Sequence, residues 1–227
     1  KGKQCVWRQI SGRLQADWEK GYIKISKNKS GSNQNQYSVQ YLPSGVIKKI
    51  KEMDFSMNPS FDFARDMFLM SFYTRGMSFV DMAYLRKKDL QNGVLSYRRR
   101  KTGQQLFIKW EKCMQEIVDK YDTSQSNYLL PIIKPFGDID ERKQYIYAAH
   151  NINRCLKIIG KELGLSVSLT LYVARHAWAS IAKSKNVPLS VISEGMGHDS
   201  EATTRIYLAS LDTMAIDKAN SMILKSL

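Results

Sequence analysis

Residues 170–208 read TLYVARHAWASIAKSKNVPLSVISEGMGHDSEATTRIYL. Apolar residues at helical spacing fill two parts of this stretch, and Pro188 and Gly195 mark where the second part begins and ends. The same stretch contains three polar elements: Arg175-His176, Gly197-His198, and Tyr207, which follows a pair of threonines. The pattern predicts two helices and intervening turns that bring an arginine, a histidine and a tyrosine together.

These three side chains suit chemistry on a phosphodiester. Attack at phosphorus builds negative charge on the two non-bridging oxygens, and the planar, permanently charged guanidinium of Arg175 can bind both of them. The phenol of Tyr207 is a weak nucleophile at its usual pKa, yet its oxygen can form a covalent phosphoester and later leave. His198 can donate a hydrogen bond to the same phosphate or move a proton near neutral pH.

In order and spacing, the three elements resemble the C-terminal catalytic motif of the tyrosine recombinases, the family of phage and transposon integrases. More particularly, the chain is similar to integrases of mobile elements in Bacteroides-like bacteria. The resemblance implies a mainly α fold with a small antiparallel β-sheet, and site-specific DNA recombination through a 3′-phosphotyrosyl intermediate. Tyr207 would be the nucleophile, and Arg175 and His198 would bind the phosphate. No metal or nucleotide cofactor is implied, because the phosphotyrosine bond stores the energy of the DNA bond that is cut.

Each of these residues also has an ordinary structural interpretation. His198 alone would be a commonplace packing histidine, and Tyr207, between Ile206 and Leu208, would pass for a core aromatic. The agreement of three separated elements favours the catalytic interpretation.

Position 172 departs from the family pattern, which has a histidine three residues before the arginine. This chain has Tyr172, whose phenol can donate a hydrogen bond to phosphate but is a poor proton acceptor at neutral pH. We therefore expect Tyr172 to assist at the phosphate, and the identity of the general base stays open. His176 is expected to be structural, and Thr170 is expected to cap the helix that carries these residues.

A second departure lies in the family's first motif, which TRGMSFVDMAYL at residues 74–85 resembles. Ser78 stands where the family has an arginine, and losing such a contact commonly costs on the order of several kcal/mol of transition-state stabilisation. We expect another arginine to compensate, either Arg75 or one of the run 98–100. The alternative is that Arg75 is an ordinary solvated loop charge. Asp81 is expected to have a structural or orienting role.

Residues 94–110 predict a β-hairpin, with strands at 94–100 and 105–110 and a turn at Lys101-Thr102-Gly103. In the family a lysine on this turn reaches the minor groove and helps protonate the leaving 5′ oxygen, and Lys101 matches it. An ammonium can act as a general acid when burial against DNA and neighbouring cations lower its pKa. The alternative is a lysine that only neutralises phosphate charge within the basic run RRRK.

The composition fits a DNA-binding protein. The chain has 227 residues, with 35 basic against 21 acidic side chains and a formal net charge of +14, which favours a polyanionic partner and most simply double-stranded DNA. A ribosome-associated or merely soluble basic protein is an alternative that charge alone leaves open. Three scattered cysteines have no metal-ligand spacing, and neither a signal peptide nor a membrane-spanning run is evident. These features predict a cytoplasmic protein with no membrane partner.

Two parts are expected along the chain. Residues 1–41, which include a linker-like run at 27–36, form a leading segment or the end of a preceding DNA-binding domain. Residues 42–227 form the catalytic domain, with further helices predicted near 44–53, 58–74, 78–85, 111–121 and 141–163. The apolar tail at 213–227 resembles a terminal helix that in relatives docks on a neighbouring protomer. We therefore expect a monomer alone and a homo-tetramer on DNA.

Two rival functions stay open at the level of sequence. A type IB topoisomerase-like DNA relaxase shares the chemistry but rejoins the same strand. A DNA-binding accessory or regulatory protein keeps the fold, while Ser78 and Tyr172 have weakened its catalysis.

Overall fold

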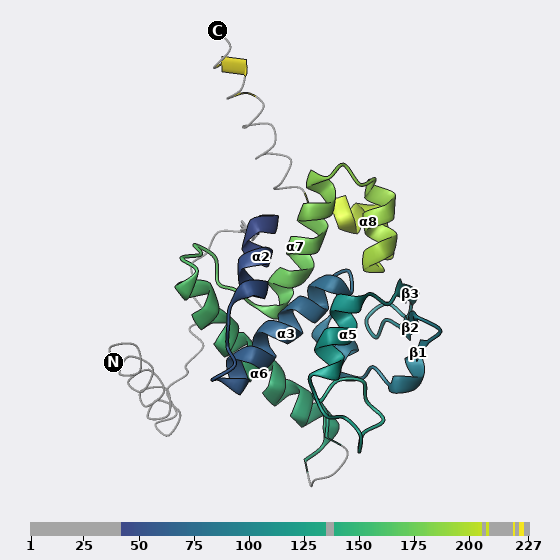
Figure 1. Cartoon of the computed structure of the whole chain (residues 1–227). Coiled ribbons are helices and arrows are strands. Elements are labelled where there is room, and N and C mark those ends of the chain that lie inside the picture. Colours follow the sequence, from purple (N-terminus) through teal and green to yellow (C-terminus); the bar gives the residue numbers. More distant parts are fainter. Residues whose placement is uncertain (1–41, 135–138, 206–207, 209–219, 221–222, 225–227) are drawn as a thin grey trace, which may run out of the picture. The chain divides into compact units, whose positions relative to one another are not determined.

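The computed structural model describes residues 42–134, 139–205, 208, 220 and 223–224. The helices with assigned bounds are α2 (Ser44–Glu52), α3 (Pro59–Tyr73), α4 (Phe79–Ala83), α5 (Lys112–Asp119), α6 (Glu141–Glu162), α7 (Leu171–Ser184) and α8 (Leu189–Met196), with a 3-10 turn η1 (Lys87–Asp89). The strands β1 (Leu90–Gln91), β2 (Val94–Arg98) and β3 (Gln105–Lys109) form an antiparallel sheet in the order β1-β2-β3. The predicted mainly α fold with a small antiparallel sheet is confirmed (Figure 1).

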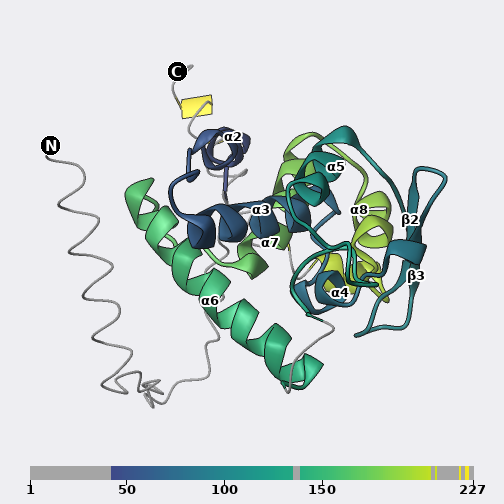
Figure 2. The same ribbon diagram turned by 60° about the horizontal axis from the view of Figure 1, so that its bottom comes forward.

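Helix α3 lies among the other helices, and its side chains form much of the core. It begins at Pro59, whose missing N–H would be unpaired in the first turn in any case, and the Asn58 side chain caps it by accepting a hydrogen bond from the Phe61 N–H. Phe68 and Met70 are completely buried. Because α3 packs against α2, α5, α6 and α7, it holds the helical part of the domain together (Figure 2).

Helix α7 receives its N-terminal cap from another helix. Thr170 occupies the capping position, but its side chain makes no capping hydrogen bond. Instead the Asn153 side chain on α6 accepts a hydrogen bond from the Leu171 N–H at 2.9 Å, which satisfies a donor that the first turn leaves unpaired. The prediction of Thr170 as the capping side chain was wrong, because Asn153, which is distant in sequence, supplies the side-chain acceptor at this end of the helix.

The sheet is a hairpin with one short extra strand. Arg98 lies opposite Gln105 and Val94 opposite Lys109, so the predicted hairpin is confirmed with strands one or two residues shorter than expected. Alternate side chains of β2 and β3 point into the core, as the pleat of a strand requires, and they are Leu95, Tyr97, Leu106 and Ile108. Figures 1 and 2 show the hairpin beside α8, and this placement brings its turn to the candidate site.

A buried cluster of charges ties α3 to the end of α5. Asp66 is 3% exposed and accepts hydrogen bonds from Arg65, from the Lys120 ammonium at 2.9 Å and from the Tyr121 hydroxyl at 2.8 Å. Asp62 forms ion pairs with the same two cations. Two carboxylates thus face two cations, and this pairing offsets the cost of removing the charges from water.

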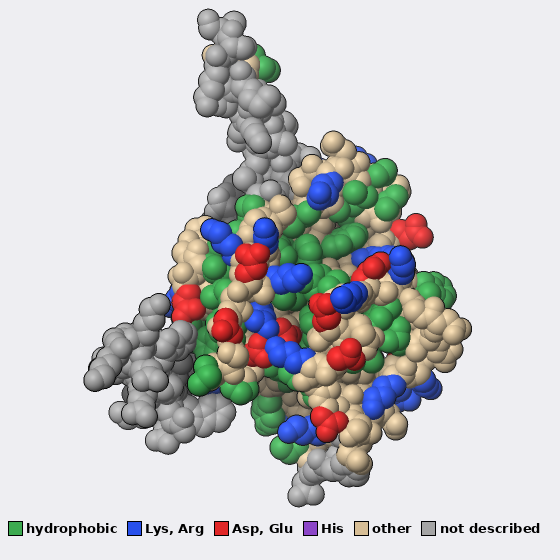
Figure 3. Space-filling model, viewed as in Figure 1, with side chains coloured by type: hydrophobic (Ala, Val, Ile, Leu, Met, Phe, Trp, Pro, Cys, Tyr) green, Lys and Arg blue, Asp and Glu red, His purple; other side chains and the backbone are tan. Residues whose placement is uncertain are grey.

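Figure 3 shows basic and acidic side chains intermixed over the face that it presents, with apolar side chains between them. None of the helices in the described ranges is long and apolar enough to cross a membrane. Within the same ranges no group of three or more His, Cys, Asp and Glu side chains is placed to hold a metal ion. Tyr207, the leading segment 1–41, and the tail apart from residues 220, 223 and 224 lie outside the described residues.

Candidate active site

Arg175 is buried where α7 meets two turns. Its side chain is 7% exposed; Nη1 donates to the Gly76 carbonyl at 2.7 Å, and Nη2 donates to the Met196 carbonyl at 2.8 Å. Gly76 has φ +75, and a Cβ placed there would lie 2.8 Å from the Cα of Arg175. Glycine adopts that backbone without strain, and its lack of a Cβ leaves room for α7 at this distance. The turn after α3 therefore positions the guanidinium.

The turn after α8 is held by hydrogen bonds from three side chains to three consecutive carbonyl groups of the turn. The Met196 carbonyl accepts from Arg175, the Gly197 carbonyl from Arg99 Nη1, and the His198 carbonyl from Gln104 Nε2 at 3.1 Å. Arg175 comes from α7, whereas Arg99 and Gln104 come from the two ends of the hairpin turn. The helix that carries the arginine and the hairpin that carries the lysine are thus fastened to the turn that carries the histidine.

Gly197 makes this close approach possible. It ends α8 in the left-handed conformation with φ +63, as the Gly-His pattern suggests for a helix end. A Cβ at this position would lie 2.8 Å from Leu106 Cδ1 and 3.3 Å from Arg99 Cδ. The hairpin therefore packs directly on the glycine that precedes His198.

His198 is half-buried among cations. Its Nδ1 lies 2.6 Å from the Thr204 Oγ1, and Thr204 is completely buried. Burial, and then the charges of Arg175, Arg99 and Lys101, lower the pKa of His198 from its usual 6.5 to about 4. The imidazole is therefore neutral at physiological pH, with one nitrogen able to donate a hydrogen bond and the other able to accept one.

Lys101 lies on the hairpin turn, exposed to solvent. Its charge and that of Arg175 both act on His198, so the hairpin turn lies near the histidine. The preceding residue, Arg100, donates its backbone N–H to Asp81 Oδ1 at 2.9 Å. Asp81 is 4% exposed and anchors the base of the turn to α4.

Ser78, at the position where the family has an arginine, is part of a helix cap. Its hydroxyl accepts from the Asp81 N–H at 3.4 Å and donates to Asp81 Oδ2 at 2.6 Å. The serine is therefore turned toward Asp81 and carries no positive charge that could meet a phosphate.

Arg75 follows α3 in the left-handed conformation, with φ +61. Its side chain is half-buried, and its Cδ would lie 3.7 Å from a Cβ placed on Gly195 of α8. Its charge, with those of Arg175 and Arg99, opposes the rise in the pKa of the buried Tyr97 that burial and the Asp81 charge produce. Arg75 thus lies near the cationic cluster, and its role in replacing the missing arginine stays a prediction.

Tyr172 lies in the first turn of α7 and is 60% exposed. Its ring meets the edge of the His176 ring, with centroids 4.5 Å apart and planes at 84°. Burial and the Arg175 charge lower the pKa of His176 to about 4, so this histidine is also neutral. The expected assistance of Tyr172 at the phosphate stays a prediction.

Arg99 is the site residue that sequence reasoning did not single out. It is 7% exposed, whereas Arg98 and Arg100 on either side are exposed. The signal was present in the alternation of the strand, because Leu95 and Tyr97 are inward-facing and the next inward position is Arg99. If the alternation of inward and outward side chains is continued one residue past the end of β2, it predicts that Arg99 faces inward and that Arg98 and Arg100 face outward.

A helical domain in which an arginine, a histidine turn and a lysine-bearing hairpin meet has the architecture of a tyrosine recombinase catalytic domain. The chain belongs to the phage integrase family, whose profile matches residues 40–214. No curated protein sequence matches the chain.

Solved structures with a similar fold include three recombinases. A XerH site-specific recombinase in a post-cleavage complex with palindromic difH substrate has a TM-score of 0.60 and 19% identity, over 88% of this chain and 58% of that one. XerA recombinase has a TM-score of 0.54 and 18% identity, over 86% and 69%. The Tn1549 transposon integrase, in complex with transposon right end DNA, has a TM-score of 0.54 and 14% identity, over 78% and 63%. At these identities the likeness shows the fold.

Proposed function

We propose that this chain is the catalytic part of a site-specific DNA recombinase that cuts and rejoins DNA through a 3′-phosphotyrosyl intermediate. The observation that carries the proposal is the meeting of Arg175, His198 and the hairpin turn of Lys101 around three consecutive carbonyls. These elements come from distant parts of the sequence, and the charges of Arg175, Arg99 and Lys101 all act on His198. Such preorganised charge is what phosphoryl transfer requires.

The proposed reaction begins with attack of the Tyr207 phenol oxygen on the scissile phosphorus. The O–P bond to tyrosine forms as the phenol loses its proton to a general base, whose identity stays open. The P–O5′ bond breaks at the same time, and the 5′ oxygen leaves as a hydroxyl by taking a proton from Lys101. Arg175 and the neutral His198 donate hydrogen bonds to the non-bridging oxygens as charge builds on them. A 5′-hydroxyl from a partner duplex then gives its proton to Lys101 and attacks the phosphotyrosine, the P–O bond to Tyr207 breaks, and the tyrosine regains its proton as the phosphodiester is restored.

Tyr207 lies outside the described residues, but the residues on either side of it support this role. Thr204 is bonded to His198, and Leu208 is buried in one apolar cluster with Ile192 and Met196 of α8. These two residues, three before and one after position 207, thus lie beside the histidine and in the cluster that includes α8.

Double-stranded DNA is the proposed partner. The net charge of +14 favours a polyanion, and the solved XerH and Tn1549 integrase structures are DNA complexes. We propose further that the chain belongs with the integrases of mobile elements in Bacteroides-like bacteria, which its sequence resembles, and that it acts in the cytoplasm where the DNA lies. The reaction as proposed uses no metal or nucleotide.

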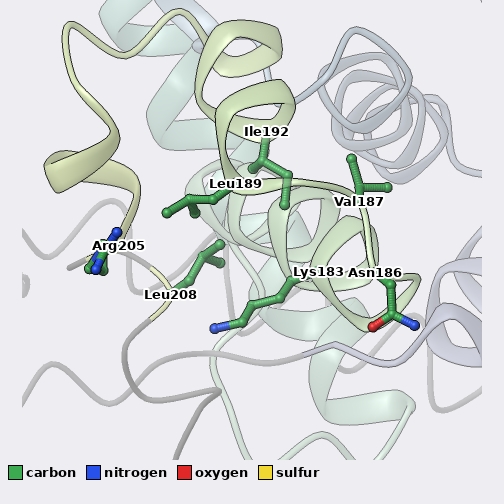
Figure 4. A pocket seen from close by; sticks show the side chains of 7 residues that line it. All are labelled: Lys183, Asn186, Val187, Leu189, Ile192, Arg205 and Leu208. Atoms are coloured by element: carbon green, nitrogen blue, oxygen red, sulfur yellow. The ribbon is translucent and has the colours of Figure 1, made fainter.

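We also propose that protomers assemble on DNA through the C-terminal tail. A cavity of about 430 Å³ is lined by Lys183, Asn186, Val187, Leu189, Ile192, Arg205 and Leu208. Figure 4 shows the side chains of Leu189, Ile192 and Leu208 lying close together, with the nitrogens of Lys183 and Arg205 nearby. The exposed apolar Ile223 and Leu224 of the tail are the groups that such a cavity on a neighbouring protomer would take. The solved lambda integrase structures, a dimer on a core site and a tetramer on a Holliday junction, support this assembly.

The assembly is tested by the mass of the DNA complex in solution. Leu189→Glu, inside the cavity, should reduce the complex to protein monomers on separate sites. Val191→Glu, on the same helix but 51% exposed, is the control and should assemble like the wild type. Equal assembly of both variants would exclude the cavity as the docking site.

The function is tested with a nicked suicide DNA substrate. After cleavage the short fragment that carries the new 5′-hydroxyl diffuses away, so the strand cannot be resealed and the covalent complex accumulates. The wild type should give a protein–DNA adduct on a denaturing gel, and Tyr207→Phe should give none. Tyr147→Phe, at an exposed tyrosine on α6, is the control and should react like the wild type. DNA binding by the wild type with no adduct would instead favour the regulatory protein.

A second assay separates recombination from relaxation. The recombinase should join strands from two duplexes that carry the same site, whereas a type IB relaxase would reseal the original strand only. Strand exchange that depends on Tyr207 would therefore exclude the relaxase.

A further inference from the structure

The site lacks an arginine at position 78, and the structure offers a replacement in the hairpin. We infer that Arg99 is the second guanidinium that binds the scissile phosphate, in place of the arginine that Ser78 does not supply. This inference rests on the proposed function. It is carried by the burial of Arg99, by its hydrogen bond to the turn of His198, and by its place beside Arg175.

The first step is the position of the Arg99 side chain. It is buried and donates from Nη1 to the Gly197 carbonyl, next to the Met196 carbonyl that Arg175 occupies. The two guanidinium groups thus bind neighbouring peptide units of one turn, and His198 is the next residue. An oxyanion held by Arg175 and His198 would lie beside Arg99 as well.

The second step is the exclusion of the neighbouring arginines. Arg98 is exposed and donates from Nη1 to Gly103 across the hairpin turn. The Arg100 guanidinium lies 3.7 Å from the centre of the ring of Tyr84, the C-terminal capping residue of α4. These contacts of Arg98 and Arg100 are made to the hairpin turn and to the end of α4, whereas Arg99 is bonded to the turn of His198.

The third step compares Arg99 with Arg75. The Arg75 side chain runs along α8 at Gly195, and Arg99 is bonded to the residue directly before His198. After burial and the charge of Arg175, the charge of Arg99 is the next cause that lowers the pKa of His198. The contacts of the two arginines therefore favour Arg99 as the partner of Arg175.

The fourth step is chemical. A guanidinium has five N–H donors in one plane, and the bond to Gly197 uses one of them. The remaining donors allow a bond to a non-bridging phosphate oxygen while the turn stays fastened. Burial keeps the charge of Arg99 poorly screened by water, so it acts strongly on the charge that develops in the transition state.

A purely structural role for Arg99, as a clamp on Gly197, makes a different prediction from a phosphate-binding role. A phosphate-binding arginine matters because the non-bridging oxygens are charged. If one of them is replaced by a methyl group, the scissile methylphosphonate is neutral, and its transition state carries one negative charge instead of two. Arg175 alone can then stabilise that charge, and a second guanidinium is no longer needed. A structural clamp would matter equally for both substrates.

The experiment measures formation of the covalent adduct on suicide DNA with either a phosphate or a methylphosphonate at the scissile position. On the phosphate, Arg99→Ala should slow adduct formation by roughly 10²–10³-fold relative to the wild type. On the methylphosphonate, the same comparison should give a loss of less than about 10-fold, since the second negative charge that Arg99 would stabilise is absent. Equal losses on the two substrates would overturn the inference and leave Arg99 as a clamp.

Two further variants guard against loss of folding. Arg98→Ala, at the exposed neighbour, is the matched control and should react within about two-fold of the wild type, as surface changes usually do. Arg99→Lys keeps a positive charge and a donor to Gly197 but loses the bidentate geometry. Its thermal melting should match the wild type, and its adduct rate on phosphate should still fall, with recovery on the methylphosphonate.

A rescue experiment tests the replacement directly. If Arg99 performs the task of the missing arginine, then Ser78→Arg should restore adduct formation to Arg99→Ala by at least about 10-fold, the order of one bidentate contact. No restoration, together with equal losses on both substrates, would exclude the replacement. An adduct that forms in Arg99→Ala at the wild-type rate would overturn the inference alone, whereas absence of any wild-type adduct would overturn the proposed function itself.

Discussion

Arg175 and Arg99 donate hydrogen bonds to neighbouring carbonyl oxygens, those of Met196 and Gly197, although they come from a helix and a hairpin far apart in the sequence. These carbonyls stand at the C-terminal end of α8, where unpaired backbone oxygens carry partial negative charge. That charge stabilises two nearby cations when DNA is absent. The same pairing fixes the guanidinium groups before a phosphate arrives, which is the preorganisation that transition-state stabilisation needs.

The first prediction concerns Gly76, which packs on the backbone of Arg175. Gly76→Ala should lower the free energy of unfolding by about 2–4 kcal/mol, because alanine is strained at φ +75 and its Cβ would lie 2.8 Å from the Arg175 Cα. Adduct formation should fall with it, since α7 must shift. Chemical denaturation and the suicide-substrate assay measure the two effects.

Gly93→Ala is the control for this prediction. Gly93 has φ +73, almost the same as Gly76, but no atom lies within 4 Å of a Cβ placed there. In Gly93→Ala the free energy of unfolding should fall only by the cost of the strained backbone, about 1–2 kcal/mol, and adduct formation should be unchanged. Equal destabilisation of the two variants would show that contact with α7 contributes nothing.

The second prediction concerns the cap of α7. Asn153→Ala removes the acceptor of the Leu171 N–H and should destabilise the protein by about 1–2 kcal/mol, the usual cost of a lost cap. Asn151→Ala, an exposed asparagine on the same helix that accepts from Arg154, should stay within about 0.5 kcal/mol of the wild type. A cap role would be excluded if the two variants melted alike.

The third prediction concerns Asp81 as a residue that positions the turn of Lys101. Asp81→Ala should slow adduct formation by about 10-fold or more, because the Arg100 N–H loses its acceptor and the turn loosens. Asp81→Asn keeps an oxygen for that N–H and should retain most of the rate.

A substrate with sulfur in place of the leaving 5′ oxygen checks that Asp81 acts through Lys101. A thiolate leaves without being protonated, so the lysine is no longer needed. The loss in Asp81→Ala should then shrink toward the wild-type rate. A loss of unchanged size on the sulfur substrate would refute the positioning role.

The fourth prediction is a dependence of stability on pH. Burial, with nearby cations, lowers the pKa of His176 and of His198 from 6.5 to about 4 in the folded protein. Between those values the unfolded chain binds protons that the folded chain does not, so stability is highest above pH 6.5 and falls as the pH drops toward 4. Thermal melting should follow this course, and replacing both histidines with glutamine should flatten it. An unchanged slope in the double variant would contradict the lowered pKa values.

The sequence alone determined the helices, the hairpin and the family. Pro59 after Asn58, the long apolar periodicity that ends at Gly164, and Pro188 before an eight-residue helix are local signals. Such signals indicate where these helices begin or end, because many caps and turns depend on adjacent residues. The order and spacing of Arg175, His198 and Tyr207 indicated the tyrosine recombinase family, and the family match confirms it.

The tertiary structure decided which side chains meet. No local pattern could show that Asn153 caps α7, or that Arg99 and Arg175 hold adjacent carbonyls. Each contact joins elements that are distant in sequence or depends on where a side chain is directed. The sequence thus supplied the residues of the site, and only the packing of α7, α8 and the hairpin selected among three neighbouring arginines the one that faces His198.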